Sequence, residues 1–250
     1  MKAKISIITA TYNSIDTLKY ALESLNSQTY KNVEHIIIDG GSTDGTVEWL
    51  ENNQDKFSKW ISEKDKGIYD ALNKGIKIAS GDIIGFMHAD DFYAYDDVLQ
   101  DVVTAFEESS CELLYGDLEY VSSQNIERVV RYWHSGDFKV ENLKRGWMPP
   151  HPTVYFKREV VEKYGGFDLK YKISADYEWL LRVLKDNISY FYLEKVMVKM
   201  RVGGASNKGL KNIYRKSKED YIALKSHNFK AFFVLLFKNL SKINQFFIRK

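Results

Sequence analysis

The sequence predicts an α/β fold with a mostly parallel central sheet. Four short apolar runs, at residues 5–9, 33–38, 60–62 and 82–87, are typical of buried strands. A segment with helical periodicity follows each run, so strand and helix alternate through the first half of the chain. Such alternation is typical of parallel sheets whose strands are joined by helices.

Apolar residues at three- and four-residue intervals mark the first and the last of these helices. The positions that carry this pattern are Leu18, Leu22, Leu25, Val98, Val102 and Phe106. The helix after the second strand is expected to begin near Thr46, and the helix after the third to cover residues 69–79. Ser80 and Gly81 end this third helix, since glycine is common just beyond a helix.

The second half alternates less regularly. Its expected strands, of which the first two form a candidate hairpin, cover residues 111–121, 126–133, 153–156 and 188–202. Helices are expected at 159–164 and from about Ser174. A loop at 146–152 holds all three prolines of the chain.

Composition limits the class of protein. The chain has 250 residues, 44% of them hydrophobic, which is enough for one large domain or for one domain with an appendage. A net charge of +2 gives no sign of a nucleic-acid partner. The single cysteine, Cys111, excludes an intramolecular disulfide framework and is compatible with the reducing cytoplasm. No stretch is long enough to span a bilayer, and the N-terminal apolar run is too short for a signal peptide.

Polar segments follow each of the four predicted parallel strands. In open α/β sheets, ligands bind beyond the carboxyl ends of the strands. The four segments at this edge read Thr11-Tyr12-Asn13, Asp39-Gly40-Gly41-Ser42, Asp65-Lys66-Gly67 and His88-Ala89-Asp90-Asp91. Three of the four contain acids, so this edge suits a positive charge.

These segments belong to a longer series of motifs. T-Y-N, D-G-G-S-T-D-G-T, D-K-G-I-Y-D-A-L-N-K-G and a D-D pair are followed by M-P-P-H-P-T, Y-G-G-F-D and S-A-D-Y-E-W-L-L-R. In this order, over residues 4–206, they resemble the family 2 glycosyltransferases, which are inverting enzymes of the GT-A fold that use nucleotide-diphosphate sugars. The resemblance implies a GT-A domain at 1–206. Its Rossmann-like nucleotide-sugar-binding half covers about 1–110, and a smaller acceptor-binding half covers 111–206.

The resemblance assigns Asp91 to a divalent cation, Mn²⁺ or Mg²⁺, and Asp90 to the ribose or to a metal-bound water. Such a cation compensates the charge of a leaving diphosphate, and it prefers carboxylate oxygens. Adjacent strand residues point to opposite sides, so both acids are not expected to reach one ion directly. The alternative is a turn or a helix cap, where aspartate is common.

The other strand tips are assigned by the same resemblance to the nucleotide. Asp39 would accept a hydrogen bond from the base, with uracil N3–H expected, because an ionised carboxylate is only an acceptor. Thr11 and Tyr12 match the segment that meets the base. Asp65 and Lys66 match the next nucleotide-facing loop. The alternatives are a turn-forming role for Asp39, a core position for Tyr12 and a solvated charge pair in the third loop.

Asp176 is the candidate catalytic base. Inversion needs one group to take the proton of the acceptor hydroxyl while that hydroxyl attacks the anomeric carbon. Asp176 lies at the start of a predicted helix, whose dipole favours the ionised form that a base requires. The alternative is an ordinary first-turn acid with Ser174 as the cap.

Five further residues are weaker candidates for contacts with the acceptor, the donor sugar or the diphosphate. His88 shares a strand face with Asp90, and His151 lies in the proline-rich loop between the two halves. Trp147 in the same loop would stack on a sugar ring or belong to the core. Arg201 and Ser206 lie in a segment that would close over the diphosphate.

Residues 207–250 are predicted to form a basic amphipathic helical tail around the apolar run 231–237. Such a helix fits the surface of an anionic membrane leaflet, and docking on the domain or on a second subunit is the alternative. Many bacterial enzymes of the family act on lipid-linked acceptors. The resemblance therefore implies transfer to a saccharide or lipid-linked acceptor in surface-polysaccharide synthesis, in the cytoplasm or at the inner face of the cell membrane.

Two other functions compete with this one. A nucleotidyltransferase that makes sugar nucleotides should have a glycine-rich, basic loop after the first strand, where T-A-T-Y-N stands instead. A non-catalytic partner or scaffold domain of the same fold would be favoured by loss of Asp91 or Asp176, and both acids are present.

Overall fold

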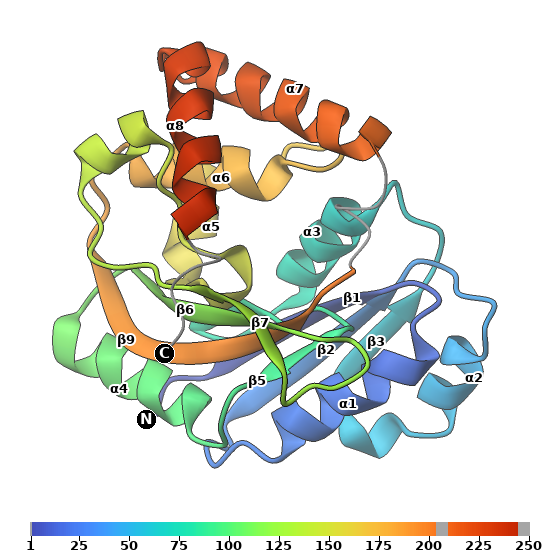
Figure 1. Ribbon diagram of the computed structural model, residues 1–250. Helices are drawn as coiled ribbons and strands as arrows, with labels where there is room; N and C mark the ends of the chain where they lie inside the picture. Colours follow the sequence, from blue (N-terminus) through green and yellow to red (C-terminus); the bar gives the residue numbers. More distant parts are fainter. Residues whose placement is uncertain (1, 204–209, 245–250) are drawn as a thin grey trace.

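The computed structural model describes residues 2–203 and 210–244, whose strands form one sheet (Figure 1). The strands are β1 Ile5–Thr11, β2 Val33–Asp39, β3 Lys59–Ser62, β4 Ile83–Phe86, β5 Asp91–Tyr93, β6 Leu113–Val121, β7 Val129–Trp133, β8 Tyr155–Lys157 and β9 Tyr190–Arg201. The sheet order in these ranges is β3-β2-β1-β4-β8-β6-β9-β5, and β7 pairs with β6 beside this row.

The helices lie between and after these strands. They are α1 Ile15–Asn26, α2 Thr46–Glu51, α3 Ile68–Ile78, α4 Val98–Ser109, α5 Arg158–Tyr164, α6 Ala175–Leu184, α7 Leu210–Ser226 and α8 Ala231–Asn244. Short 3-10 helices, η1 Gln54–Lys56, η2 Val140–Arg145 and η3 His151–Thr153, occupy three of the loops. The helices predicted near residues 46, 69, 159 and 174 each begin within one residue of the expected position.

Strands β1 to β4 form the parallel half of the sheet. β1 lies between β2 and β4 and is parallel to both, and β2 is parallel to β3. Thr11 therefore lies beside Asp39, and Asp39 beside Ser62. The carboxyl ends of these strands meet at one edge, which confirms the predicted α/β class and brings the four polar segments to the same side of the sheet.

Beyond β4 the strands run in mixed directions. β8 is antiparallel to β4 and to β6, whereas β6 and the long β9 are parallel. The candidate hairpin is confirmed, since β6 and β7 pair in antiparallel fashion. The short strand β5 was not predicted. It starts at Asp91 and pairs with the end of β9, so Asp91 belongs to a strand pair that links the two halves.

Alternate residues of the central strands supply apolar layers on both faces of the sheet. Ile8 of β1 and Ile38 of β2 belong to the layer that includes α3, α5 and α6. Ile7 packs with α1 and α4, and Ile37 with α1 and α2. Figure 1 shows α1 and α4 on one side of the sheet and α3 and α6 on the other.

The two helices of the predicted tail pack over α6 (Figure 1). Leu224 of α7 and Val234 of α8 are buried in the same apolar layer as α6. Lys238 Nζ of α8 lies 2.8 Å from Asp220 Oδ2 of α7 and 3.3 Å from the ring centroid of Tyr177 in α6. This packing favours the docking alternative for the tail. The boundary expected at residue 206 and the last residues, 245–250, lie outside the described residues.

The described helices all fall short of the length and apolar composition that a membrane span requires. The apolar run predicted at 231–237 lies within α8. One side of α8 faces α7 and η2, and its outer side is exposed.

Gly75 lets α3 approach β1 closely, since a Cβ at this position would lie 2.3 Å from Ile8 Cγ2. We expect Gly75→Ala to lower the free energy of unfolding by about 1–3 kcal/mol through overpacking. This cost exceeds the gain of about 1 kcal/mol in helix propensity. Urea unfolding measures the change, with Lys77→Ala on the exposed side of α3 as the control. Equal stability of the two variants would show that α3 does not pack this closely.

Candidate active site

Three strand-tip segments come together at the edge of the parallel half. A Cβ on Gly40 would lie 2.8 Å from Asp65 Oδ2 and 3.4 Å from Tyr12 Cδ2, so a larger residue here would require the Asp65 carboxylate to shift. Tyr12 is 62% exposed, which excludes the core position that was its alternative. The exposed ring and the neighbouring carboxylate form a surface that suits a planar ligand with hydrogen-bonding groups.

Asp39 is fully buried, and its carboxylate holds the loop that follows β2. Oδ2 accepts hydrogen bonds from the backbone N–H groups of Gly41 and Ser42, each at 3.0 Å. The Ser62 hydroxyl donates to the same oxygen at 2.7 Å, and the Ser42 hydroxyl donates to Oδ1. The structure thus contains the turn-forming contacts of the alternative interpretation. A bond from Asp39 to a nucleobase stays a prediction.

Thr11 and the third loop complete this edge. The Thr11 hydroxyl oxygen is buried and has no hydrogen-bond partner among the described residues, so a bound ligand could supply one. Asp65 Oδ1 accepts the backbone N–H of Gly67 at 2.9 Å and thereby shapes its own loop. Lys66 is exposed, and its ammonium group can reach toward an anionic ligand.

Asp90 lies in the turn between β4 and β5 and Asp91 is the first residue of β5, so the extended geometry assumed for the tip of β4 does not persist. The Asp91 N–H donates to the His88 carbonyl oxygen at 3.1 Å. Arg201, at the end of β9, is buried and donates from Nη1 to the Asp90 carbonyl oxygen at 2.7 Å. Its guanidinium carbon lies 5.0 Å from the ring centroid of Phe92. Arg201 therefore anchors the turn that carries the two acids.

The Asp91 carboxylate is buried without a partner. Neither of its oxygens has a hydrogen bond among the described residues. Burial raises the pKa of Asp91 well above its ordinary value, and the charge of Asp90 raises it further, while the nearby backbone N–H of Arg201 and then the charge of Arg201 oppose both effects. A divalent cation would supply the missing charge, so the residue fits the role of a metal ligand.

This carboxylate could not hold a cation by itself. Among residues 2–203 and 210–244, no cluster of three or more His, Cys, Asp or Glu side chains has the geometry of a metal site. A hard cation needs about six oxygen ligands, and protein sites for phosphate substrates commonly take several of them from the substrate and from water. A single buried carboxylate such as that of Asp91 therefore fits a cation that binds together with a diphosphate.

Asp176 lies in the first turn of α6, as predicted, and is held by a residue of the other half. The Tyr69 hydroxyl, from the first turn of α3, lies 2.8 Å from Asp176 Oδ1 and 2.8 Å from the Ile173 carbonyl oxygen. Burial opposes ionisation of Asp176, but the charge of Lys216 and the hydrogen bond from Tyr69 hold the pKa of Asp176 below its ordinary value. A carboxylate kept ionised in a buried setting can act as a base.

Two histidines, His88 next to the acidic turn and His151 of η3, lie near Asp176. The rings of His88 and His151 are 5.8 Å apart, and the charge of Asp176 acts on both. Burial lowers the pKa of His151 to about 4, so this ring is neutral at pH 7. Both of its ring nitrogens are buried without a hydrogen-bond partner among the described residues. His151 therefore has polar atoms that a bound sugar hydroxyl could satisfy, which agrees with its predicted place near the acceptor or donor sugar.

Trp147 lies in an aromatic cluster of the second half. Its ring stacks on Phe138, with centroids 4.8 Å apart, and meets Tyr115 edge-on. Its Nε1 donates to the Ser135 carbonyl oxygen at 2.7 Å. These contacts support the core alternative, and a sugar contact stays a prediction. Ser206, the partner expected for Arg201, lies outside the described residues.

Sequence reasoning missed the residues that position Asp176. Tyr69 belongs to the quoted motif D-K-G-I-Y-D-A-L-N-K-G, which marked its importance without revealing its partner. Lys216 lies in the segment that was taken as a separate tail. No local pattern connects Tyr69 or Lys216 with Asp176, because the contacts arise only when the helices pack.

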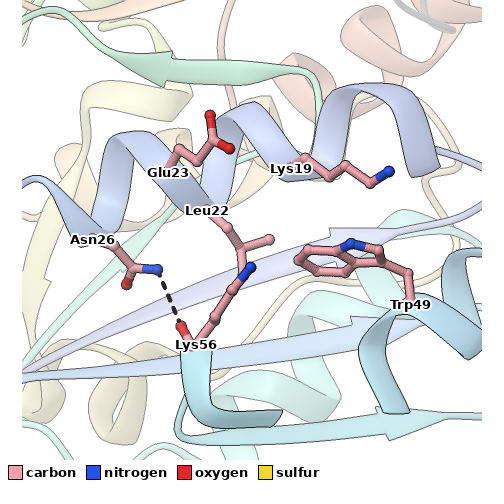
Figure 2. Close-up of a pocket in the computed structure, with 6 residues that line it drawn as sticks. All are labelled: Lys19, Leu22, Glu23, Asn26, Trp49 and Lys56. Atoms are coloured by element: carbon pink, nitrogen blue, oxygen red, sulfur yellow. Dashed lines mark hydrogen bonds between the residues drawn. The ribbon is translucent and has the colours of Figure 1, made fainter. Parts of the chain in front are cut away.

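A groove on the surface lies apart from the candidate active site. Figure 2 shows a groove of about 370 Å³ between α1, α2 and η1. It is lined by Lys19, Leu22, Glu23, Asn26, Trp49 and Lys56. Lys56 lies 5.3 Å from the Trp49 ring centroid, and its carbonyl oxygen accepts a hydrogen bond from Asn26 Nδ2 at 3.4 Å. None of the predicted site residues lines this groove.

Comparison with solved structures shows the GT-A fold. A Staphylococcus aureus TarS fragment, 1–349, crystallised with UDP-GlcNAc, aligns with a TM-score of 0.71 and 17% identity, over 98% of this chain and 72% of that one. In the structure of a longer TarS chain, this chain spans 42% of the length. Pyrobaculum calidifontis PcManGT, a mannosyltransferase in complex with GDP-Man and Mn²⁺, aligns with a TM-score of 0.65 and 19% identity, over 95% of this chain and 69% of that one.

Sequence comparison gives the family. An uncharacterized glycosyltransferase of Mycobacterium tuberculosis is 35% identical over 183 residues, which are 71% of this chain and 68% of the relative. A PGL/p-HBAD biosynthesis glycosyltransferase of Mycobacterium bovis is 28% identical over 71% of this chain and 68% of its own. The model named Glycosyl transferase family 2 matches residues 6–165. The GT-A fold and the acidic edge agree with this match. The chain belongs to glycosyl transferase family 2.

Proposed function

We propose that the protein is an inverting glycosyltransferase that moves one sugar from a nucleotide-diphosphate sugar to an acceptor hydroxyl, with Asp176 as the general base. One observation carries the proposal. The charge of Lys216 and the hydrogen bond from Tyr69 hold Asp176 ionised. The charge of Asp176 acts on His151 and on His88, which directly precedes the turn with Asp90. Asp176 and the acidic edge that would face the diphosphate would then belong to one site, as a direct displacement requires.

The reaction follows from this arrangement. The acceptor oxygen attacks the anomeric carbon from the face opposite the diphosphate, and the bond from that carbon to the diphosphate oxygen breaks. The hydroxyl proton passes to Asp176, and the nucleoside diphosphate leaves with the electron pair. Tyr69 keeps its own proton because burial, and then the charge of Asp176, raise its pKa well above the ordinary value. It therefore orients the base and does not compete with it.

Asp91 would hold a Mn²⁺ or Mg²⁺ ion together with the diphosphate. Asp90 would bind the ribose or a water molecule on that ion. Such an ion acts as a Lewis acid that neutralises the charge of the leaving group. The protein's own contribution is to keep the Asp91 carboxylate buried and without other partners. The Mn²⁺ in the PcManGT complex supports this part of the proposal.

We propose a uridine diphosphate sugar as the donor, because the TarS fragment was crystallised with UDP-GlcNAc. Tyr12 would stack on the uracil, Thr11 and Asp39 would lie at its edge, and Asp65 and Lys66 would face the rest of the nucleotide. The acceptor would be a saccharide or a lipid-linked glycan in surface-polysaccharide synthesis. The PGL/p-HBAD biosynthesis relative supports an acceptor of this class.

A lipid-linked acceptor would place the enzyme at the cytoplasmic face of the membrane, and the outer side of α8 suits such a surface. Its large exposed apolar residues are Phe232, Phe233, Leu236, Phe237 and Leu240. Exposed cations on α7 are Lys211, Arg215, Lys218 and Lys225, whereas its acids Glu219 and Asp220 are buried. Of these cations Arg215 is paired with Glu219, and the exposed lysines together with the aromatic residues of α8 fit an anionic leaflet.

We expect Asp176→Asn to lower kcat by about 10²- to 10⁴-fold, since the amide cannot take the acceptor proton. The dissociation constant of the donor should stay unchanged. Release of nucleoside diphosphate, followed over a panel of nucleotide sugars with Mn²⁺ and acceptor, measures the rate. Asp186→Asn, at the exposed end of the same helix, is the matched control. Transfer by the Asp176→Asn variant at the wild-type rate would eliminate the base assignment.

Asp91→Asn should remove the stimulation of UDP binding by Mn²⁺, because an amide oxygen replaces a charged ligand. Stability should not fall, since the substitution removes an unpartnered buried carboxyl group. Calorimetric titration with UDP, with and without Mn²⁺, provides the measurement, and Asp55→Asn at an exposed position is the control. An unchanged response to Mn²⁺ in the Asp91→Asn variant would contradict the metal role.

The double variant Phe233→Ser and Leu236→Ser should lose binding to vesicles that contain anionic phosphatidylglycerol. Val130→Ser, an exposed apolar residue of β7, should bind as the wild type does. Co-sedimentation with anionic and with neutral vesicles tests both. Failure of the wild-type protein to co-sediment with anionic vesicles would refute the membrane proposal, and so would formation of a dimer through this surface.

A further inference from the structure

Glu219 of α7 caps the backbone that leads into α6. Its Oε2 accepts the N–H groups of Lys172, Ile173 and Ser174 at 2.9, 2.8 and 3.1 Å. The first N–H groups of a helix and of the residues before it lack partners within the helix, and Ser174 makes no side-chain cap at this position. A carboxylate from another helix therefore accepts the hydrogen bonds of the N–H groups in this turn. Asp176 follows it directly.

The Glu219 carboxylate is itself fixed. Its side chain is only 10% exposed, so most of it is shielded from solvent. Arg215 Nε, one turn earlier on α7, donates to the other oxygen, Oε1, at 3.1 Å. Both carboxylate oxygens are thus engaged, and α7 is tied to the start of α6 by three backbone hydrogen bonds. A charged acceptor makes each of these bonds stronger than a neutral one.

Lys216 of α7 contacts the same turn through its backbone, and its charge acts on Asp176. It lies between Arg215 and Glu219 on α7, and the Ser174 hydroxyl donates to its carbonyl oxygen at 3.5 Å. Among the effects on the pKa of Asp176, burial is the largest and raises it, and the charge of Lys216 is the next and lowers it. The first described turns of α7 thus act on both the position and the charge of Asp176.

Other groups also face Asp176. Tyr69 of α3 donates a hydrogen bond to it. His151 of η3 and His88, next to the acidic turn, lie near it. The charge of Asp176 also contributes to the raised pKa of Tyr120 in β6. Burial lowers the pKa values of both histidines, so they add little positive charge at pH 7. Lys216 is the permanent cation of this set, and its loss should change the ionisation of the base.

We propose that α7 is a working part of the catalytic site, in which Glu219 positions the turn that carries Asp176 and Lys216 supplies the positive charge beside it. This inference rests on the proposed role of Asp176 as the base. Glu219 and Lys216 are positioning residues, because they act through Asp176 and touch no substrate. The segment that the sequence marks as a basic tail is then required for transfer and not only for attachment.

Glu219→Ala tests the positioning role. It should lower kcat by about 10- to 100-fold through displacement of the base, with an unchanged KM for the donor. Hydrogen exchange at the N–H groups of residues 172–174 should become faster. Glu219→Gln keeps an acceptor oxygen and should recover part of both losses. Wild-type exchange and wild-type kcat in the Ala variant would overturn the proposal.

Lys216→Met tests the charge. A base works only when ionised, and loss of the lysine raises the pKa of Asp176, so the acidic limb of the kcat/KM profile should move to higher pH. At high pH the rate should approach that of the wild type. Lys218→Met, an exposed lysine of the same helix, should leave the profile in place. Identical profiles for the Lys216 and Lys218 variants would overturn the proposal.

These outcomes are separable from failure of the proposed function. If wild-type protein transfers no sugar, or Asp176→Asn transfers at the wild-type rate, the base assignment itself fails. If wild-type protein is active, Asp176→Asn is inactive and the α7 variants behave as the wild type, only the inference about α7 fails. The exchange rates of residues 172–174 are measured without any substrate, so they report on the Glu219 contact in either case.

Discussion

The parallel pairing of β1 with β2 on one side and β4 on the other is the constraint on which the site depends. This pairing brings Thr11, Asp39 and the turn after β4 to one edge. Each of the loops is then closed by its own contacts, such as the hydrogen bonds of Asp39 to the loop after β2. A ligand at this edge meets backbone that is already ordered, and pre-organisation of this kind lowers the entropic cost of binding.

The second half completes the site by bringing a base to that edge. Tyr69 and Asp176, 107 positions apart, form a hydrogen bond between the first turns of α3 and α6. Gly75 sets how closely α3 lies against β1, so packing of the nucleotide half determines where the base sits. On the opposite flank, α7 holds the turn before α6 through Glu219. Asp176 is therefore fixed from two directions, by elements that the sequence places in different halves.

How much of this is predictable depends on the range of the interactions. Strand tips such as Asp39 and Asp91 follow from local patterns, because parallel strands must end at a common edge. Strand β5 was missed because three residues between turns carry no periodicity. The residues that hold Asp176 were missed for a different reason. Tyr69 contacts Asp176, and Glu219 contacts the backbone before it, only through tertiary packing, which neither spacing nor composition encodes. The cations and the apolar run of the tail fitted a membrane surface as well as docking on the domain, and only the structure shows its apolar residues in the same buried layer as α6.

The central claim is that one site holds a cation at Asp91 and a base at Asp176 on two sides of the donor sugar. A crystal of the protein grown with Mn²⁺ and an unhydrolysed uridine diphosphate sugar, measured by anomalous diffraction, tests it most directly. The account predicts a manganese peak at bonding distance from an Asp91 oxygen and from the diphosphate, with the Asp176 carboxylate facing the anomeric carbon. A manganese peak elsewhere, or a sugar bound away from Asp176, would contradict it.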